Sequence, residues 1–200
     1  MAIISVLISA VFAGSMIGIA GTTSLSAGNT YIGSLLFCVG LYTICAFGLR
    51  LYTGRVGYVI DDHSKENLIH LLLTWIGNFI GAALTGYVVS LAKPDLKALC
   101  ENIANNRLAQ NFSVTIAMAF FCGMLMYIAV HTYKITSGKV LGMLLCVPAF
   151  IISGFEHSVA DMYYFACAGA FAKSILHILL VSVGNALGAI AVAYAMRFKK

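Results

Sequence analysis

The first 49 residues contain no Asp, Glu, Lys or Arg, and the first charged side chain is Arg50. A helix that crosses the hydrocarbon core of a bilayer needs about 20 apolar residues, so this stretch is long enough for two crossings. The polar run at residues 21–30 divides it, and we expect a turn there. Over the whole chain 10% of residues are charged, whereas soluble domains carry about 25%. The sequence therefore predicts an all-α membrane protein.

The remaining composition argues against several other classes of protein. The net charge of +5 is modest and no basic run is interleaved with aromatic residues, so nucleic-acid binding is not indicated. Nothing basic precedes the first apolar run, which favours a retained first span over a signal peptide. The six cysteines include no CxxC pair; five lie in apolar runs and Cys100 lies in a polar connector. The histidines lack ligand spacing, so we expect no metal site and no cofactor.

Six nearly uncharged segments separated by polar connectors predict six passages of one transmembrane domain, residues 1–200. They cover residues 2–20, 31–49, 68–92, 113–132, 140–172 and 174–196. An even number of passages places both termini on one side of the membrane. Lysines such as Lys65, Lys134 and Lys139 would share that side, which favours cytoplasmic termini.

Two of these passages are interrupted near mid-depth. The fifth has 33 residues, about 50 Å as a continuous helix, against a hydrocarbon core of about 30 Å. It contains Glu156, His157 and Asp161 just after Ser153-Gly154, and the second passage is interrupted at residues 48–54. Irregular backbone at this depth is tolerated only where protein buries it or it lines a water-filled cavity. We therefore expect broken second and fifth helices.

The same short motif, GNxxGA, follows each break. Asn78 lies 30 residues after Gly48, and Asn185 lies 31 residues after Gly154. Three passages per half reverse the direction of the second copy, which predicts an inverted 3+3 repeat, with repeat one at about 1–92 and repeat two at about 112–198. Discontinuous helices in such repeats form the substrate path near the midplane. The motif glycines alone also fit plain close helix packing.

Ionisable residues at mid-membrane depth are functional candidates by default. We expect His157 to face the path, because a neutral imidazole can donate to an anion and exchanges protons near physiological pH. The alternative is a structural histidine locked to a neighbouring helix. Glu156 is expected to bind backbone N–H groups freed at the break. Asp161 is expected to orient His157, to cap a helix or to contact an interface.

Other polar residues leave two interpretations each. The amides of Asn78 and Asn185 both donate and accept, so each either ties a broken helix to its neighbour or lines the path. Leu51, Tyr52 and Thr53 fit a constriction formed by two bulky side chains and one hydroxyl group. They also fit a plain re-entrant turn. The remaining histidines are expected at helix ends or membrane interfaces: His63, His70, His131 and His177.

Three features together resemble the formate/nitrite transporter family, which also contains hydrosulfide channels. They are the GFEHSVADM segment at residues 154–162, the paired GNxxGA motifs and the LYTG run at residues 51–54. The resemblance extends from the first span through Ala189. It implies an aquaporin-like six-helix protomer and a homopentamer with one pore per protomer.

The resemblance also implies roles for single residues. The family's central histidine falls on His157, its preceding glutamate on Glu156 and its loop threonine on Thr53. Its lysine before the GFEH segment falls on Lys139 and its last-helix asparagine on Asn185. The family's apolar constrictions fall on Phe37, Leu41, Leu51, Tyr52 and Phe150.

Several positions depart from the family pattern. Arg50 stands where an acidic residue is usual, and Gly123 and Asp161 each stand where an asparagine is usual. The amphipathic segment ahead of the first span is nearly absent, which puts gating by that segment in doubt. These departures leave the substrate open among formate, nitrite and hydrosulfide.

The predicted function is a channel or transporter for a small monovalent anion in the cytoplasmic membrane, with the anion, protons and the bilayer as partners. Lys139 would raise the local anion concentration at the cytoplasmic mouth. In a low dielectric the pKa of a weak acid rises, so the substrate would cross as the neutral acid or hydrogen-bonded to His157. The alternatives are a neutral-solute channel, for which Asn-Pro-Ala motifs are missing, and a membrane enzyme using His157 and Glu156.

Overall fold

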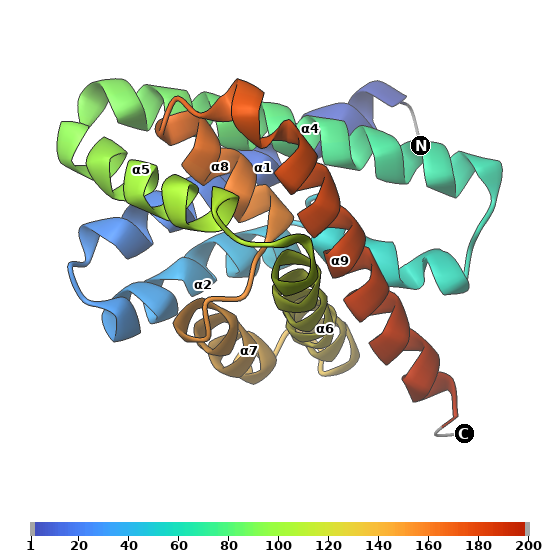
Figure 1. Ribbon diagram of the computed structural model, residues 1–200. Coiled ribbons are helices and arrows are strands. Elements are labelled where there is room, and N and C mark those ends of the chain that lie inside the picture. Colours follow the sequence, from blue (N-terminus) through green and yellow to red (C-terminus); the bar gives the residue numbers. More distant parts are fainter. Residues whose placement is uncertain (1–2, 199–200) are drawn as a thin grey trace.

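A computed structural model describes residues 3–198, and helices make up most of that part of the chain (Figure 1). The start of the first expected span at residue 2 lies outside the described residues. The elements are α1 Ile3–Ser26, α2 Thr30–Ala46, α3 Tyr52–Arg55, the 3-10 helix η1 Val56–Ile60, α4 Lys65–Ala92, α5 Pro94–Leu108, α6 Phe112–Ile135, α7 Leu141–Ile152, α8 Ser158–Cys167 and α9 Phe171–Arg197.

Four of the described helices are long and apolar enough to cross a bilayer: α1, α4, α6 and α9. The shortest of these has 24 residues, about 36 Å of helix, which exceeds a hydrocarbon core of about 30 Å. Large apolar side chains such as Leu72 and Leu176 stay exposed on their outer faces. Such faces suit contact with lipid or with other membrane helices, as expected of a multi-pass membrane protein.

The GNxxGA motifs lie where long helices pack most closely, α4 against α1 and α9 against α6. A Cβ atom on Gly81 would overlap the carbonyl oxygen of Val11 in α1. A Cβ atom on Gly188 would overlap the carbonyl oxygen of Phe120 in α6 in the same way. Small residues are needed where helix backbones approach this closely, and this explains the second glycine of each motif.

Two helices stop short inside the molecule. Helix α2 ends at Ala46 and helical backbone resumes at Tyr52, and α7 ends at Ile152 and helical backbone resumes at Ser158. The second residue of each gap is a glycine with positive φ, Gly48 at +65° and Gly154 at +70°. Glycine adopts this conformation without a Cβ clash. The first gap, residues 47–51, overlaps the interruption expected at residues 48–54, and the second, residues 153–157, begins at the Ser153-Gly154 pair expected to break the fifth passage.

Helix α5 differs from the polar connector expected between residues 93 and 111. Pro94 occupies its first turn, where the missing N–H is no loss. Leu96, Cys100 and Ala104 are buried, and α5 packs against α8. Their spacing of four residues places them on one helix face. Cys100 is therefore a buried thiol and not a loop thiol.

Candidate functional site

His157 is the last residue of the second gap and precedes α8 directly. Its Nδ1 accepts a hydrogen bond from the backbone N–H of Ala160 (3.1 Å), and its Nε2 lies 2.7 Å from Oγ1 of Thr53. A nitrogen that accepts an N–H carries no proton of its own, so the neutral ring has its proton on Nε2. The Nε2–H then donates to the Thr53 hydroxyl. The two broken helices thus meet at one hydrogen bond, buried at 1% and 0% exposure.

Apolar side chains surround this hydrogen bond. Phe37 and Phe150 meet edge to face with ring centroids 5.7 Å apart, and Phe150 stacks on the His157 ring at 5.9 Å. Leu41 and Leu51 are 1% and 2% exposed in the same cluster. We call Phe37, Leu41, Leu51 and Phe150 the apolar collar. An ion entering such a collar loses its hydration, and the imidazole and the hydroxyl offer it polar contacts there.

Two of the candidate path residues lie elsewhere. The hydroxyl of Tyr52 donates to the carbonyl oxygen of Ser182 (3.2 Å), and its ring packs with Val56 and Tyr127. Successive residues of a helix point about 100° apart, so Leu51 and Thr53 can face the site while Tyr52 faces α9. Lys139 is exposed in the connection before α7, away from the collar.

Asn78 repairs the first gap. Its Oδ1 accepts the N–H of Tyr52 (2.8 Å), and its Nδ2 donates to the carbonyl oxygens of Ala10 and Arg50 (2.8 Å each). The side chain is fully buried. Both of its donor hydrogens are used, so it ties α1, α4 and the break together and has no N–H left for a ligand.

Asn185 repairs the second gap by the same pattern. Its Oδ1 accepts the N–H of Ser158 (2.9 Å), and its Nδ2 donates to the carbonyl oxygens of Ala119 and Glu156 (2.8 Å each). This amide therefore provides the support for the broken helix that the sequence assigns to the Glu156 carboxylate. Buried peptide groups without partners are rare and costly, which accounts for an asparagine at both positions.

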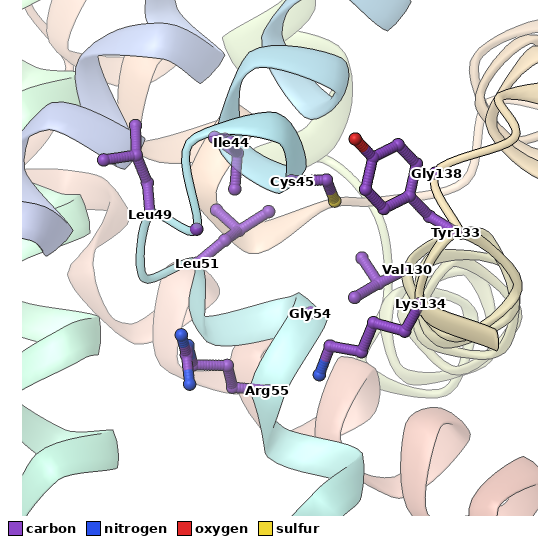
Figure 2. A pocket seen from close by; sticks show the side chains of 11 residues that line it. Ile44, Cys45, Leu49, Leu51, Gly54, Arg55, Val130, Tyr133, Lys134 and Gly138 are labelled. Carbon is purple, nitrogen blue, oxygen red and sulfur yellow. The ribbon is translucent and has the colours of Figure 1, made fainter. Parts of the chain in front are cut away.

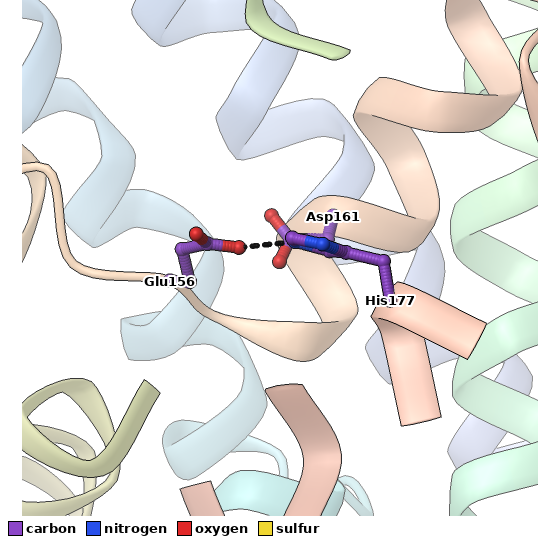
Figure 3. A group of neighbouring side chains, drawn as sticks. All are labelled: Glu156, Asp161 and His177. Atoms are coloured by element: carbon purple, nitrogen blue, oxygen red, sulfur yellow. Dashed lines mark hydrogen bonds and ion pairs between the residues drawn. The ribbon is translucent and has the colours of Figure 1, made fainter. Parts of the chain in front are cut away.

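The Glu156 carboxylate faces α9 instead. Its Oε2 lies 2.5 Å from Nε2 of His177 (Figure 3), and its Oε1 has no hydrogen-bond partner. The His177 side chain is 9% exposed, so the prediction that it lies at a helix end or interface is wrong. Asp161, fully buried beside this pair, forms an ion pair with Arg107 of α5. Its carboxylate neutralises Arg107 and does not contact the His157 ring.

A cavity of about 210 Å³ lies between the end of α2, α3 and the end of α6, beside Leu51 of the collar. Leu51 lines it together with two cations, Arg55 and Lys134 (Figure 2). Within the described chain no ion pair involves either of these side chains. Unpaired cations in a recess attract small anions from solution. We call this space the α3 cavity.

A second cavity, of about 410 Å³, lies at the other end of α2. Asn29 and Thr30 at the start of α2 line it, as do Arg107 and Tyr164. The Arg107 guanidinium lies 5.2 Å from the centre of the Tyr164 ring, a cation–π distance. We call this space the α5 cavity. A cavity lined by basic side chains therefore lies at each end of α2, but Arg107 is paired with Asp161, whereas Arg55 and Lys134 form no ion pair within the described residues.

Sequence reasoning missed Arg55, Lys134 and Arg107 as candidate site residues. Arg55 directly follows the LYTG run. This position, one turn after helical backbone resumes, could have identified it as a candidate near the site. Lys134 served only as a marker of orientation. Arg107 had no such signal, because its segment was expected to be a connector without helical geometry.

Comparisons with known proteins agree on one family. A sequence profile described as "Formate/nitrite transporter" matches residues 1–199. The formate channel BtFdhC of Bacillus thuringiensis is 28% identical over 78% of this chain and 68% of its own length. The nitrite transporter NirC of Salmonella typhimurium is 25% identical over 92% and 78%. A formate-nitrite transporter of Plasmodium knowlesi is 26% identical over 80%, and this chain spans 62% of its length.

Two solved structures share the fold. One is described as an "FNT family ion channel", with a TM-score of 0.89, 23% identity, and coverage of 98% of this chain and 90% of that one. The other is a "pentameric formate channel with formate bound", with a TM-score of 0.80, 22% identity, and coverage of 99% and 98%.

Proposed function

Because this chain belongs to the formate/nitrite transporter family, we propose that it conducts formate or nitrite, with hydrosulfide as a third candidate, across the cytoplasmic membrane. Its motif resemblance to that family is confirmed by the profile match. At the level of the family it is an anion transporter and not an enzyme. The choice of substrate follows from relatives that are named as formate channels and nitrite transporters.

The proposed architecture has six passages in one transmembrane domain. They are α1, α2 with α3, α4, α6, α7 with α8, and α9, in inverted repeats at about 1–92 and 112–198. The shared asparagine pattern at the two gaps supports this repeat. Both termini would then be cytoplasmic. The exposed apolar helix faces and a pentameric structural neighbour support a homopentamer with one pore per protomer.

Entry of the anion is the first step of the proposed mechanism. Arg55 and Lys134 raise the anion concentration in the α3 cavity. Arg107 in the α5 cavity does not add to this effect, because Asp161 balances its charge. Lys139, exposed in the α6–α7 connection, adds positive charge around the mouth. The α3 cavity thus supplies the anion to the collar.

Passage through the collar is the second step. The falling dielectric raises the pKa of a weak acid, so proton uptake by the anion becomes easier there. The anion takes the Thr53 hydroxyl's place as acceptor for the Nε2–H of His157, and the freed hydroxyl donates to the anion as well. If the anion takes up a proton from the water of the entry cavity, it leaves as the neutral acid and transport is linked to one proton. If it crosses as the anion hydrogen-bonded to His157, no proton moves with it.

One observation carries this proposal: the Nε2–H of His157 is the donor that the apolar collar encloses, bonded only to a hydroxyl that can itself become a donor. Uptake of formate, nitrite and hydrosulfide into proteoliposomes tests it, with His157→Phe as the variant and exposed His63→Phe as the control. We expect a loss of at least tenfold for His157→Phe and none for the control. An unchanged rate and pH dependence would reject the role of His157.

The same vesicles separate the rival functions. Swelling in glycerol with no anion uptake would support a neutral-solute channel. Chemical conversion of the substrate in place of permeation would support a membrane enzyme.

A further inference from the structure

We propose that the Glu156–His177 pair holds the titratable proton that sets the pH dependence of transport, so that His177 is a positioning residue for the anion at His157. This inference rests on the proposed transport function for its flux readout, but the pair can be tested without transport. His177 lies on α9, twenty-one residues after Glu156, and none of the motifs contains it.

The first step is the geometry of the pair. Nε2 of His177 and Oε2 of Glu156 are 2.5 Å apart, which is short even against the roughly 2.7–2.9 Å of charge-assisted N–H···O hydrogen bonds. The other carboxylate oxygen has no partner, and Glu156 is fully buried. A buried carboxylate with one partner is costly unless that partner is charged or the carboxylate is itself protonated. One proton shared by the two side chains meets this condition.

The second step is the charge around the pair. Asp161 from α8 and Arg107 from α5 form an ion pair beside it. Tyr164 on α8, Cys122 on α6 and Cys100 on α5 also lie near Arg107, and all three are neutral at their ordinary protonation. Since Arg107 balances Asp161, the net charge of the cluster depends on the proton of the Glu156–His177 pair.

A divalent metal ion is the competing interpretation. Donor atoms of Glu156, Asp161 and His177 lie within 4.8 Å of one another, and Figure 3 shows the three side chains as neighbours. The Arg107 guanidinium already neutralises Asp161 and would repel a metal ion at this place. A proton between Glu156 and His177 requires no such displacement.

The third step is why His157 does not hold this proton. Its Nδ1 accepts the N–H of Ala160 in the first turn of α8 and so caps this helix. Protonation at Nδ1 would set two N–H groups against each other and remove the helix cap. His177 has no such constraint, and Arg107 connects the cluster to the α5 cavity.

The consequence is electrostatic. With its proton, the pair contributes no net charge beside His157; without it, Glu156 contributes a negative charge one residue from the anion's binding group. Charges at this separation interact strongly away from bulk water. Anion transport should therefore be fast at low pH and slow once the pair loses its proton.

The test compares formate uptake by proteoliposomes at about pH 5 to 8, the range in which histidines usually titrate. The variants are His177→Gln, which keeps a hydrogen-bond donor but does not titrate, and His177→Lys, which adds a lasting positive charge. His70→Gln is the control, because His70 lies 4.0 Å from Glu66 in a surface His–Glu pair.

We expect uptake by the wild type to fall at least fivefold from low to high pH. His177→Gln should flatten this dependence, His177→Lys should keep uptake high at alkaline pH, and the control should match the wild type. A wild-type pH profile in both His177 variants would overturn the proposal.

A second measurement stands apart from transport. Imidazole ¹⁵N NMR of the detergent-solubilised wild type, assigned with His177→Gln, should show a pH-dependent resonance of His177 that Glu156→Gln shifts. A His177 resonance that Glu156→Gln leaves unchanged would overturn the pairing. If none of the three anions permeates, the proposed function is wrong. The NMR titration alone then tests whether Glu156 and His177 share a proton.

Discussion

The backbone groups at the two gaps are hydrogen-bonded to an asparagine in the same way, but the gaps carry different functional side chains. Asn78 and Asn185 each use one acceptor and two donors on equivalent peptide groups. The first gap carries Arg50 and leads into Thr53, whereas the second carries Glu156 and His157. The hydrogen bonding of the interrupted backbone is therefore independent of the functional side chains that each gap carries. An asparagine provides that hydrogen bonding at both gaps.

The departures from the family pattern divide in the same way. Gly123 packs against the backbone of Asn185, as Gly14 packs against the backbone of Asn78, and a Cβ on either glycine would overlap the asparagine's carbonyl oxygen. Gly123 thus leaves room for the asparagine that binds the backbone of the second gap. Asp161 instead acts through its charge, in an ion pair with Arg107.

Arg50 has a different environment from Asp161. It is 7% exposed, and its Nε donates to Oγ1 of Thr74 (3.1 Å). No carboxylate forms an ion pair with it among residues 3–198. The cation therefore belongs to the first gap alone and has no counterpart at the second.

The largest expected effect tests the shared repair. Asn78→Ala and Asn185→Ala each remove the side-chain partner of one N–H and one carbonyl oxygen in the gap, at about 1–3 kcal/mol per group, and the tie to a carbonyl of the neighbouring helix. We expect both to lower stability by at least about 2 kcal/mol and by similar amounts, measured as thermal unfolding in detergent. Asn→Asp at each site keeps the acceptor and should recover part of the loss. A large loss at one asparagine and none at the other would break the comparison.

The next effect concerns helix packing. Gly14→Ala and Gly123→Ala force the backbones of the paired helices apart, and overpacking of this kind costs about 1–3 kcal/mol. Their melting temperatures should fall together, while Gly28→Ala, which has open space around its Cβ, reports only the backbone strain of its positive φ. Tolerance of Gly123→Ala with sensitivity of Gly14→Ala would show that the two contacts are not equivalent.

The chemical difference between the gaps should appear in transport. Arg50→Gln removes a charge with no carboxylate partner, whereas Glu156→Gln removes the partner of His177. We expect Glu156→Gln to flatten the pH dependence of formate uptake and Arg50→Gln to preserve its shape. Equal flattening in both variants would show that the two gaps contribute alike.

The smallest effect is expected at the α3 cavity. Arg55→Gln and Lys134→Gln should reduce formate uptake several-fold at low ionic strength, because fewer anions gather near the collar. The difference should shrink as salt screens the cations. Uptake that loses the same fraction at every salt concentration would indicate a packing role for these side chains.

The gaps and the paired asparagines could be read from the sequence because both leave local signals. Uncharged runs too long for the bilayer reveal the gaps, and GNxxGA recurs at matched distances. Helix α5 was missed because only three of its positions, Leu96, Cys100 and Ala104, are buried, too few to stand out in a polar segment.

Contacts between distant segments left no such signal. Fifty-four residues separate Arg107 from Asp161, and no local pattern pairs them. The orientation of Tyr52 depends on the residue at which α3 restarts, and one residue of shift would turn it toward the collar. Such details follow from tertiary packing and not from periodicity.

The central claim is that His157 and Thr53 act as one unit across the two gaps. A double-mutant cycle of formate uptake with His157→Asn, Thr53→Val and the double variant tests it most directly. We predict strong non-additivity, with the double variant no slower than His157→Asn alone. Rate losses that simply multiply would contradict the claim and place the two residues in independent roles.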